Sequence, residues 1–175
     1  MTDTAQFTLF RPSETDIPAL AALGADTFAE SHGDQYAPAD LEAFVSQVFE
    51  PAAVRGEWAD PRYAFQVAQS GDRFIGYCKL GPASGDFDCD LELKQIFVRR
   101  EHYGTPVGAA LMAWAKQEAA SRDVETLGLS VWEGNARAIR FYEKHGFERT
   151  GTVSFQVGDK EETDVTFACR VNDAG

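Results

Sequence analysis

The chain has 175 residues, 44% of them hydrophobic and 12% aromatic, which fits a single folded domain over residues 1–175 and excludes an intrinsically disordered protein. Its net charge of −12 repels phosphate backbones and anionic lipid, and no apolar run approaches the ~18 residues of a membrane span, so we expect neither nucleic acid nor a membrane as a partner. The three cysteines are widely spaced and form no Cys-x-x-Cys pair, which predicts reduced thiols in a cytoplasmic protein, without a disulfide framework or a metal site.

The N-terminal part of the sequence predicts two helices. Ser13 and Asp16 have the spacing of a capping box, and the apolar residues after them recur at helical spacing, which indicates a helix over 14–29. After a polar break, Asp40 is a capping residue for a second apolar pattern of the same period. We expect this second helix to end near Pro51, because proline disrupts the interior of a helix.

Strands are predicted next along the chain. Apolar residues alternate with smaller or polar ones over 63–67, and residues 74–80 are again typical of a strand. The turn signal Ser70-Gly71-Asp72 between them indicates a β-hairpin. Residues 89–98 carry apolar side chains in both alternating sets, so we expect a strand that is buried on much of both faces.

The second half of the sequence alternates between helix and strand signals and ends in a hairpin. Its predicted elements are a loop over 99–105, a helix over 106–121, a strand over 127–131, a short helix from Asn135 to Gly146, and two strands over 151–157 and 162–170. The complete order, α, α, β, β, β, α, β, α, β, β, describes the α/β (α+β) class, with a mixed sheet that carries helices on its faces.

The segment from Val98 to Gly108 places a glycine-bearing loop between a strand and the start of a helix. The first amides of a helix lack partners within it and carry the positive end of its dipole, so they can receive an anion such as a pyrophosphate. Arg99, Arg100 and His102 form a local basic cluster beside this loop. The alternative is that the glycines serve a turn and close packing, while the basic side chains are solvated.

Two segments resemble the GCN5-related N-acetyltransferase (GNAT) family. The segment VWEGNARAIRFYEKHGF has the family pattern Asn-x-x-Ala-x-x-Phe-Tyr-x-Lys-x-Gly-Phe, at Asn135, Ala138, Phe141, Tyr142, Lys144, Gly146 and Phe147. The segment QIFVRREHYGTPVGAALM resembles the strand, glycine loop and helix of the family, with two departures. Tyr103 stands where the family usually has Gln or Arg, and Pro106 stands where it usually has Gly, so one amide N–H is missing from the loop.

The resemblance covers about residues 70–170 well and the N-terminal helices more loosely. It implies a mostly antiparallel central sheet flanked by helices on both faces, and acetyl-CoA as the cosubstrate. It also implies that the pantetheine arm follows the backbone of Ile96, Phe97 and Val98. The other cofactor-binding positions that it implies are Tyr103, Gly104, Thr105, Pro106, Val107, Gly108, Ala109, Asn135, Ala138, Phe141 and Lys144.

Two residues are candidates for the chemistry of acetyl transfer. The resemblance places Tyr142 beside the cofactor sulfur, where its phenol can donate a proton to the leaving thiolate; the alternative is a half-buried core aromatic. Glu92 lies four residues before Ile96, on the same face of the predicted strand, and is a candidate base; the alternative is a carboxylate paired with Lys94. Cys89 has no activating neighbour, so we expect direct attack by the amine in a ternary complex rather than an acyl-cysteine.

A narrower resemblance concerns the acceptor. The segments DTFAESHGDQYAPADLEAFVSQVF and GTVSFQVGDKEETDVTF are similar to bacterial spermidine/spermine acetyltransferases of the PaiA type. This resemblance implies a small-molecule, polycationic amine as the acceptor, which the net charge of −12 suits, although an excess of Asp and Glu also serves solubility. The alternatives are another small amine, a peptide N-terminus, or an acyl-CoA-binding regulatory module without turnover. The oligomeric state stays open, a homodimer included.

Overall fold

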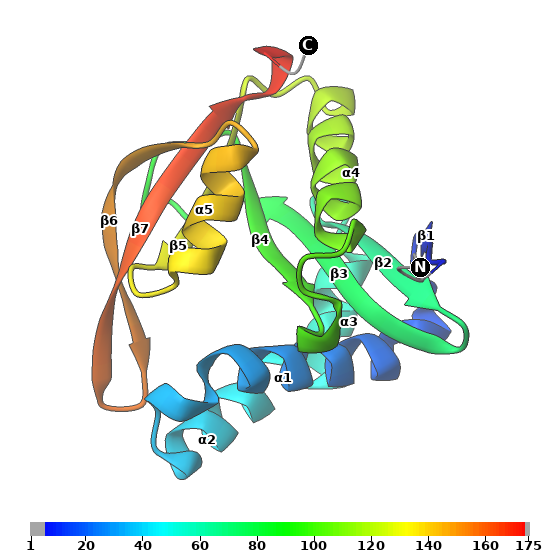
Figure 1. Ribbon diagram of the computed structural model, residues 1–175, viewed down its shortest axis with the longest axis vertical. Helices are drawn as coiled ribbons and strands as arrows, with labels where there is room; N and C mark the ends of the chain where they lie inside the picture. The colour runs from blue at the N-terminus through cyan, green and yellow to red at the C-terminus, as the bar shows by residue number, and fades with distance from the viewer. Residues whose placement is uncertain (1–5, 174–175) are drawn as a thin grey trace.

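The computed structural model describes residues 6–173 and contains a seven-stranded sheet with helices on both faces (Figure 1). The sheet order is β1-β2-β3-β4-β5-β7-β6. The helices and strands are β1 (Thr8–Phe10), α1 (Ile17–His32), α2 (Pro38–Val48), α3 (Pro51–Ala59), β2 (Ala64–Ser70), β3 (Arg73–Pro82), β4 (Leu91–Val98), α4 (Val107–Ser121), β5 (Thr126–Trp132), α5 (Ala136–Lys144), β6 (Glu148–Val157) and β7 (Lys160–Arg170).

Strands β4 and β5 separate in the middle of the sheet. They run parallel and pair only at Leu91 with Leu127 and at Glu92 with Gly128, whereas every other pair of neighbouring strands is antiparallel. β4 stays paired with β3 as far as Val98, and β5 stays paired with β7 to its last residue. The backbone of β4 beyond its first two residues therefore has no strand partner on the β5 side, and Figure 1 shows the two strands diverging.

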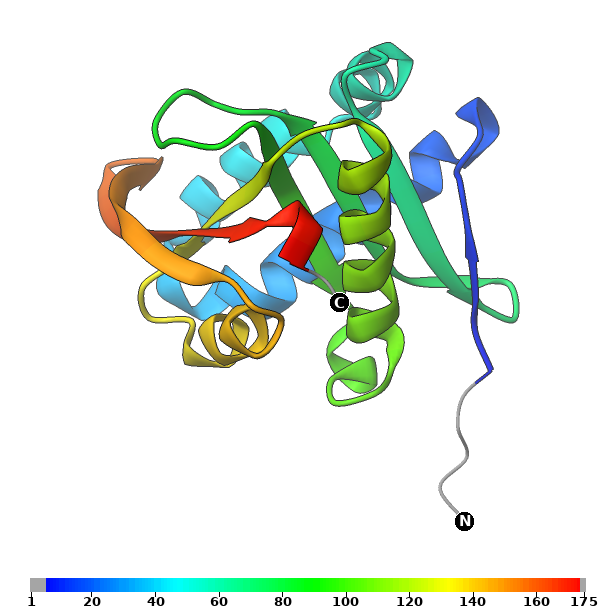
Figure 2. The ribbon, with the colours of Figure 1, turned by 90° about the horizontal axis from the view of Figure 1, so that it is seen from above.

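Helices cover the two faces of the sheet and build separate cores. α4 packs on β2, β3 and β4, where Leu111, Met112 and Ala115 are fully buried. On the opposite face, α1 and α3 pack with Ile17 and Leu23 in a second core (Figure 2). The predicted α/β (α+β) class, a mixed and mostly antiparallel sheet with helices on both faces, is confirmed.

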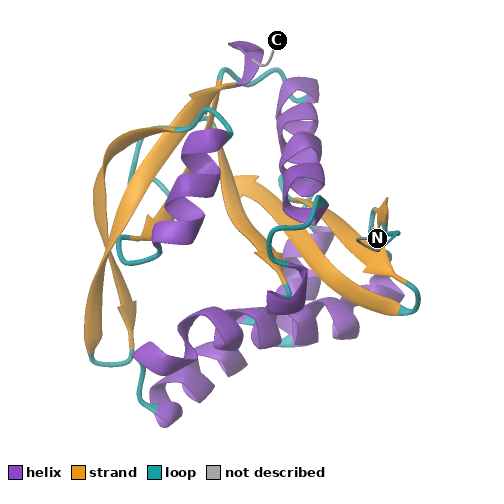
Figure 3. Cartoon of the chain, in the orientation of Figure 1, coloured by secondary structure: helices purple, strands orange, loops and turns teal. Residues whose placement is uncertain are grey.

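The hairpin of β6 and β7 extends across to the segment between α1 and α2 (Figure 3). Lys160 Nζ donates a hydrogen bond to the carbonyl of Gln35 at 3.0 Å. At the tip, Gly158 has a φ of +58°, and a Cβ there would lie 2.5 Å from Cγ of Asp40, so only glycine fits this approach. The hairpin is thereby held against the segment between α1 and α2.

Some element boundaries differ from the predictions. Ser13 N donates to Oδ2 of Asp16 at 2.7 Å, but the residues after Ser13 form a 3₁₀ turn and α1 begins at Ile17. The second helix begins at Pro38, before Asp40. Pro51 starts α3 rather than only ending α2, because proline is favourable in the first turn of a helix. The short β1 was not predicted.

The prediction of a single domain over 1–175 also includes residues 1–5 and 174–175, which lie outside the described residues. Within residues 6–173, no helix has the length and apolar character needed to cross a bilayer.

Candidate active site

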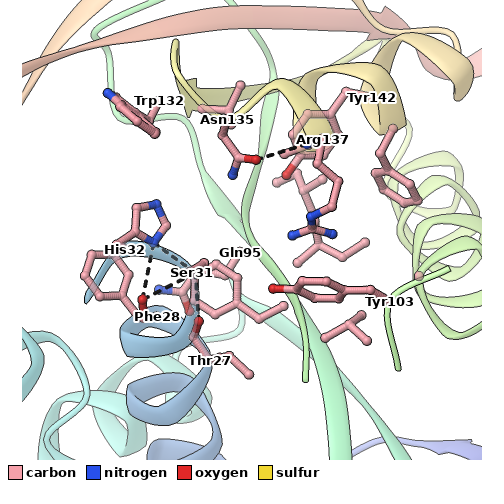
Figure 4. Close-up of a pocket in the computed structure, with 18 of the residues that line it drawn as sticks. Thr27, Phe28, Ser31, His32, Gln95, Tyr103, Trp132, Asn135, Arg137 and Tyr142 are labelled. Carbon is pink, nitrogen blue, oxygen red and sulfur yellow. Dashed lines mark hydrogen bonds between the residues drawn. The ribbon is translucent and has the colours of Figure 1, made fainter. Parts of the chain in front are cut away.

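A cavity of about 580 Å³ opens where β4 and β5 separate (Figure 4). Its walls come from α1, α2, β4, the loop between β4 and α4, the first turn of α4, the end of β5, and α5. One residue of β7, Asp164, also lines it. The cavity therefore exists because the sheet is split, and it joins segments from both halves of the chain.

One end of the cavity, which we call the amide end, is formed by residues 103–105 and the first turn of α4. Gly104 has a φ of +77°, a conformation that favours glycine. The first amide of this turn with a helical partner is that of Ala110, which donates to the carbonyl of Pro106 at 2.9 Å. The amides of 107–109 have no acceptor among the described residues, so three N–H groups at the positive end of a helix dipole are available to an anion.

Helix α5 approaches the amide end closely. The guanidinium of Arg137 lies over the ring of Tyr103, with Cζ 3.6 Å from the ring centroid. A Cβ added to Gly108 would make an ordinary contact, 3.4 Å from Cε2 of Phe141, so α5 lies directly against the first turn of α4. Asn135 caps α5, since its Oδ1 accepts a hydrogen bond from the Ala138 amide at 3.1 Å. Together, these contacts place a positive charge beside the free amides.

Tyr142 is a half-buried residue of α5 that lines the cavity. Its ring centroid lies 6.0 Å from that of Phe147 and 6.5 Å from that of Phe167, which fixes the ring against the core. Burial, and secondarily the charge of Cys78, raises the pKa of Tyr142 well above its ordinary value. The phenol therefore keeps its proton at neutral pH and can act as a proton donor.

The other end of the cavity, which we call the aromatic end, is lined by Phe28, Tyr36, Phe44, Phe49 and Trp132. His32 stacks on Phe28 with ring centroids 4.5 Å apart, and burial lowers the pKa of this imidazole. The one carboxylate among the described residues that line the cavity is Asp164, at this end. The charges of Glu162 and Asp164 add to the effect of burial in raising the pKa of Tyr36, which shows that these groups are neighbours.

The two ends lie toward opposite faces of the sheet. Tyr142 packs on Phe167, whereas Asp164 lies three positions away on the same strand and pairs with Trp132. Successive side chains of a strand point to opposite faces, so an odd separation places Asp164 on the face away from Tyr142. The cavity thus connects a face with free helix amides to a face with aromatic rings and a carboxylate.

Residues 25–147 match the acetyltransferase (GNAT) family. The chain belongs to the GNAT family. An uncharacterised N-acetyltransferase of Mycobacterium bovis is 35% identical over 150 residues, which cover 86% of this chain and 94% of that protein. This GNAT is therefore an acetyl-CoA-dependent N-acetyltransferase.

Solved structures share the fold of this GNAT at low sequence identity. The PaiA N-acetyltransferase of Thermoplasma acidophilum, in complex with coenzyme A, superimposes with a TM-score of 0.78 at 16% identity over 94% of this chain and 99% of that chain. The ribosomal-protein-S18-alanine N-acetyltransferase of Escherichia coli gives a TM-score of 0.67 at 21% identity over 97% of both chains. At these identities the neighbours establish the GNAT fold and leave the acceptor of this chain open.

The structure gathers most of the predicted cofactor-binding residues around the cavity of this GNAT. Those that line it are Ile96, Phe97, Val98, Tyr103, Gly104, Thr105, Gly108, Ala109, Asn135, Ala138, Phe141 and Lys144. Pro106 and Val107 do not line it. Pro106 precedes the first turn of α4. The side chain of Val107 is fully buried in the core, so Val107 can offer an anion its backbone amide but not its side chain.

Glu92 is not brought to the cavity, contrary to the prediction from strand alternation. Its Oε2 accepts hydrogen bonds at 2.8 Å from Lys94 Nζ and from the amide of Ser84. Opposite β3, the register of β4 passes from Gln95 to Leu93 and leaves Lys94 without a partner. This β-bulge interrupts the alternation on which the prediction depended, and the pairing with Lys94, the alternative reading, is what the structure contains.

The aromatic end was missed by the sequence analysis. Phe28, Phe44 and Phe49 have the helical spacing of core residues, and their burial is also what that pattern predicts. Asp164 is one of many carboxylates in an acidic chain. The aromatic content of residues 28–49 was the available signal, but it does not by itself distinguish a cavity wall from a core.

Proposed function

We propose that this GNAT acetylates a primary amine of a polyamine, such as spermidine or spermine, by direct attack on acetyl-CoA in a ternary complex. The observation that carries the proposal is the opposite character of the two ends of one cavity. The amide end offers unpaired N–H groups and Arg137 to an anion, and the aromatic end offers ring faces and the Asp164 carboxylate to a cation.

The amide end fits acetyl-CoA. The amides of 107–109 would hold the pyrophosphate, with the charge of Arg137 beside them. The backbone of Ile96, Phe97 and Val98 has no strand partner on the β5 side and would pair with the amides of the pantetheine arm. Pro106 supplies no N–H, so binding of the anion relies on the next three amides and on Arg137.

In this proposal the chain orients the two substrates and donates a proton to the leaving group. Acetyl-CoA supplies a thioester carbonyl for attack and a thiolate as leaving group. Tyr142 donates a proton to the departing sulfur, and its raised pKa means that the phenol carries this proton at neutral pH. Glu92 does not line the cavity, and its carboxylate is paired with Lys94. Glu92 therefore has no direct role in this proposal, and the ammonium proton of the acceptor is lost to solvent.

The aromatic end suits a chain of methylenes with charged nitrogens. Phe28, Phe49 and Trp132 provide apolar faces for the methylenes, and aromatic faces also attract ammonium groups. The resemblance to polyamine acetyltransferases of the PaiA type and the net charge of −12 support the same class of acceptor.

The test is release of CoA from acetyl-CoA with a panel of amines. We expect kcat/KM for spermidine and spermine to exceed that for propylamine by roughly tenfold or more, and the margin to shrink as salt screens the carboxylates. A peptide with an N-terminal alanine is included because structural neighbours are named for that acceptor. Efficient acetylation of the peptide with no turnover of spermidine would show that the polyamine assignment is wrong.

A further inference from the structure

Two buried polar atoms without hydrogen-bond partners among the described residues belong to the aromatic end. They are Oδ1 of Asp164 and the hydroxyl oxygen of Tyr36. Each of these two residues is 7% exposed. Buried polar groups in folded proteins are almost always paired, and an unpaired carboxylate oxygen is costly. Both atoms belong to residues that line the cavity.

The neighbouring acid of the same strand and face, Glu162, is already paired with a cation. Glu162 Oε2 accepts a hydrogen bond from Trp132 Nε1 at 3.0 Å, and Lys160 Nζ lies 2.8 Å from Glu162 Oε1. Asp164 receives one hydrogen bond, from the hydroxyl of Ser130, and this leaves its Oδ1 without a donor. The difference between the two acids shows that the local cation, Lys160, serves Glu162 and not Asp164.

Two of the cations that line the cavity are directed elsewhere. Lys94 pairs with Glu92, and Arg137 stacks on Tyr103 at the amide end. His32 is held by burial in its neutral form, and its Nδ1 lies within hydrogen-bond distance of Ser31 Oγ, at 2.9 Å. Within the described part of the chain, no ion pair includes Asp164.

The indole ring of Trp132 lines this site and is held in one orientation. Its Cα pairs with that of Asp164 across β5 and β7, and its indole N–H is held by Glu162. A Cβ added to Gly134 would lie 2.2 Å from Cη2 of Trp132, so the glycine is what allows the indole to fold back here. An aromatic face beside a carboxylate is the combination that binds ammonium groups.

Asp164 lies some distance along β7 from the contact between Tyr142 and Phe167. It lies three residues along β7 from Phe167, on which Tyr142 packs, which corresponds to about 10 Å at the rise of an extended strand. The nitrogen that attacks the thioester must be neutral and near Tyr142. A second nitrogen of the same acceptor, still charged, is the group that fits at the distance of Asp164.

We propose that Asp164, with the Tyr36 hydroxyl and the Trp132 ring, is the subsite that binds a charged nitrogen of the acceptor other than the one acetylated. This inference rests on the proposed function and names the residues that select a polyamine over a monoamine. The ligand class is an alkylammonium with at least two N–H donors, one for Oδ1 of Asp164 and one for the Tyr36 oxygen.

The first test compares Asp164→Asn with the parent enzyme on spermidine and on propylamine. We expect KM for spermidine to rise about 10- to 100-fold, because a charge-assisted hydrogen bond is lost, with kcat and the KM for acetyl-CoA little changed. Propylamine has no second nitrogen, so its kcat/KM should stay the same. Glu161→Gln, an exposed position on the opposite face of β7, is the control with the same change in net charge.

The second test measures binding of spermidine by calorimetry in the presence of CoA, so that it does not depend on turnover. The parent should bind, Asp164→Asn should bind about 10- to 100-fold more weakly, and Tyr36→Phe should lie between them. Equal affinity of the parent and Asp164→Asn overturns the subsite, and so does an equal loss of kcat/KM on propylamine and spermidine. Binding that depends on Asp164 without acetylation of spermidine supports the subsite and refutes the proposed function instead.

Discussion

Arg137 and Tyr103 form a stacked pair, with the guanidinium carbon 3.6 Å from the centre of the ring. The pair joins the first turn of α5 to the loop that precedes α4, and it stands at the amide end of the cavity. Tyr103 occupies a position where the family usually has Gln or Arg. The positive charge at the amide end is therefore supplied from α5 and oriented by the tyrosine.

Replacing Arg137 by Gln should weaken acetyl-CoA binding by roughly tenfold, because a charge-assisted contact beside the pyrophosphate is lost. The dependence of affinity on salt should also become weaker. Titration calorimetry at two salt concentrations measures both effects. Arg140→Gln is the matched control, since Arg140 is exposed on the same helix and does not line the cavity. Equal losses in the two variants would mean that only the overall charge matters.

Gly108→Glu should reduce acetyl-CoA affinity roughly tenfold or more, because a carboxylate beside the free amides of α4 repels the pyrophosphate. Gly108→Ala should bind acetyl-CoA almost as well as the parent, since the added Cβ would make an ordinary contact with Phe141 at 3.4 Å. Calorimetry separates the two variants, with circular dichroism to verify folding. A folded Gly108→Glu protein with unchanged affinity would contradict the placement of the cofactor.

Tyr142→Phe should lower kcat roughly 10²- to 10⁴-fold, the usual effect of losing a general acid. The ring contacts with Phe147 and Phe167 remain, so acetyl-CoA affinity and thermal stability should change little. Stopped-flow or steady-state assays of CoA release measure kcat. A variant that turns over at the parental rate would leave Tyr142 with a packing role alone.

Asp164→Asn should stabilise the enzyme at pH 7. Burial raises the pKa of Asp164 above its ordinary value of 3.8. A hydrogen bond from Ser130 opposes this shift, and the charge of Glu162 adds to it. The folded state then binds the proton more tightly than the unfolded chain. The contribution of this carboxyl to stability therefore declines as the pH rises from its unfolded pKa to its folded pKa. We expect the variant to melt about 2–4 °C higher at pH 7, with the difference narrowing below the unfolded pKa. A lower melting temperature at pH 7 would contradict an unpaired buried carboxylate.

Local signals predicted most of the elements because periodicity, caps and turns are read from neighbouring residues. The β2–β3 hairpin and the capped helix α5 are examples. Pro51 is compatible with the end of one helix and with the first turn of the next, and the local sequence does not distinguish the two. β1 has three residues and is specified by its pairing with β2, which is a tertiary interaction.

The two ends of the cavity differed in how far the sequence revealed them. The amide end and α5 are contiguous motifs, so their residues were named in advance. The aromatic end is assembled from Tyr36, Trp132 and Asp164, which only the fold brings together. Glu92 was assigned by uninterrupted alternation along β4, and the bulge at Lys94 changed the face on which it lies.

The most direct test of the account is the initial-velocity pattern with spermidine and acetyl-CoA varied against each other. None of the three cysteines, all within the described residues, lines the cavity, and burial raises the pKa of Cys89 to about 11. An acyl-cysteine is therefore not expected, and the proposed reaction requires both substrates to be bound in the cavity at the same time. The account predicts reciprocal plots that intersect. Parallel lines, with acetyl-enzyme formed in the absence of the amine, would contradict it.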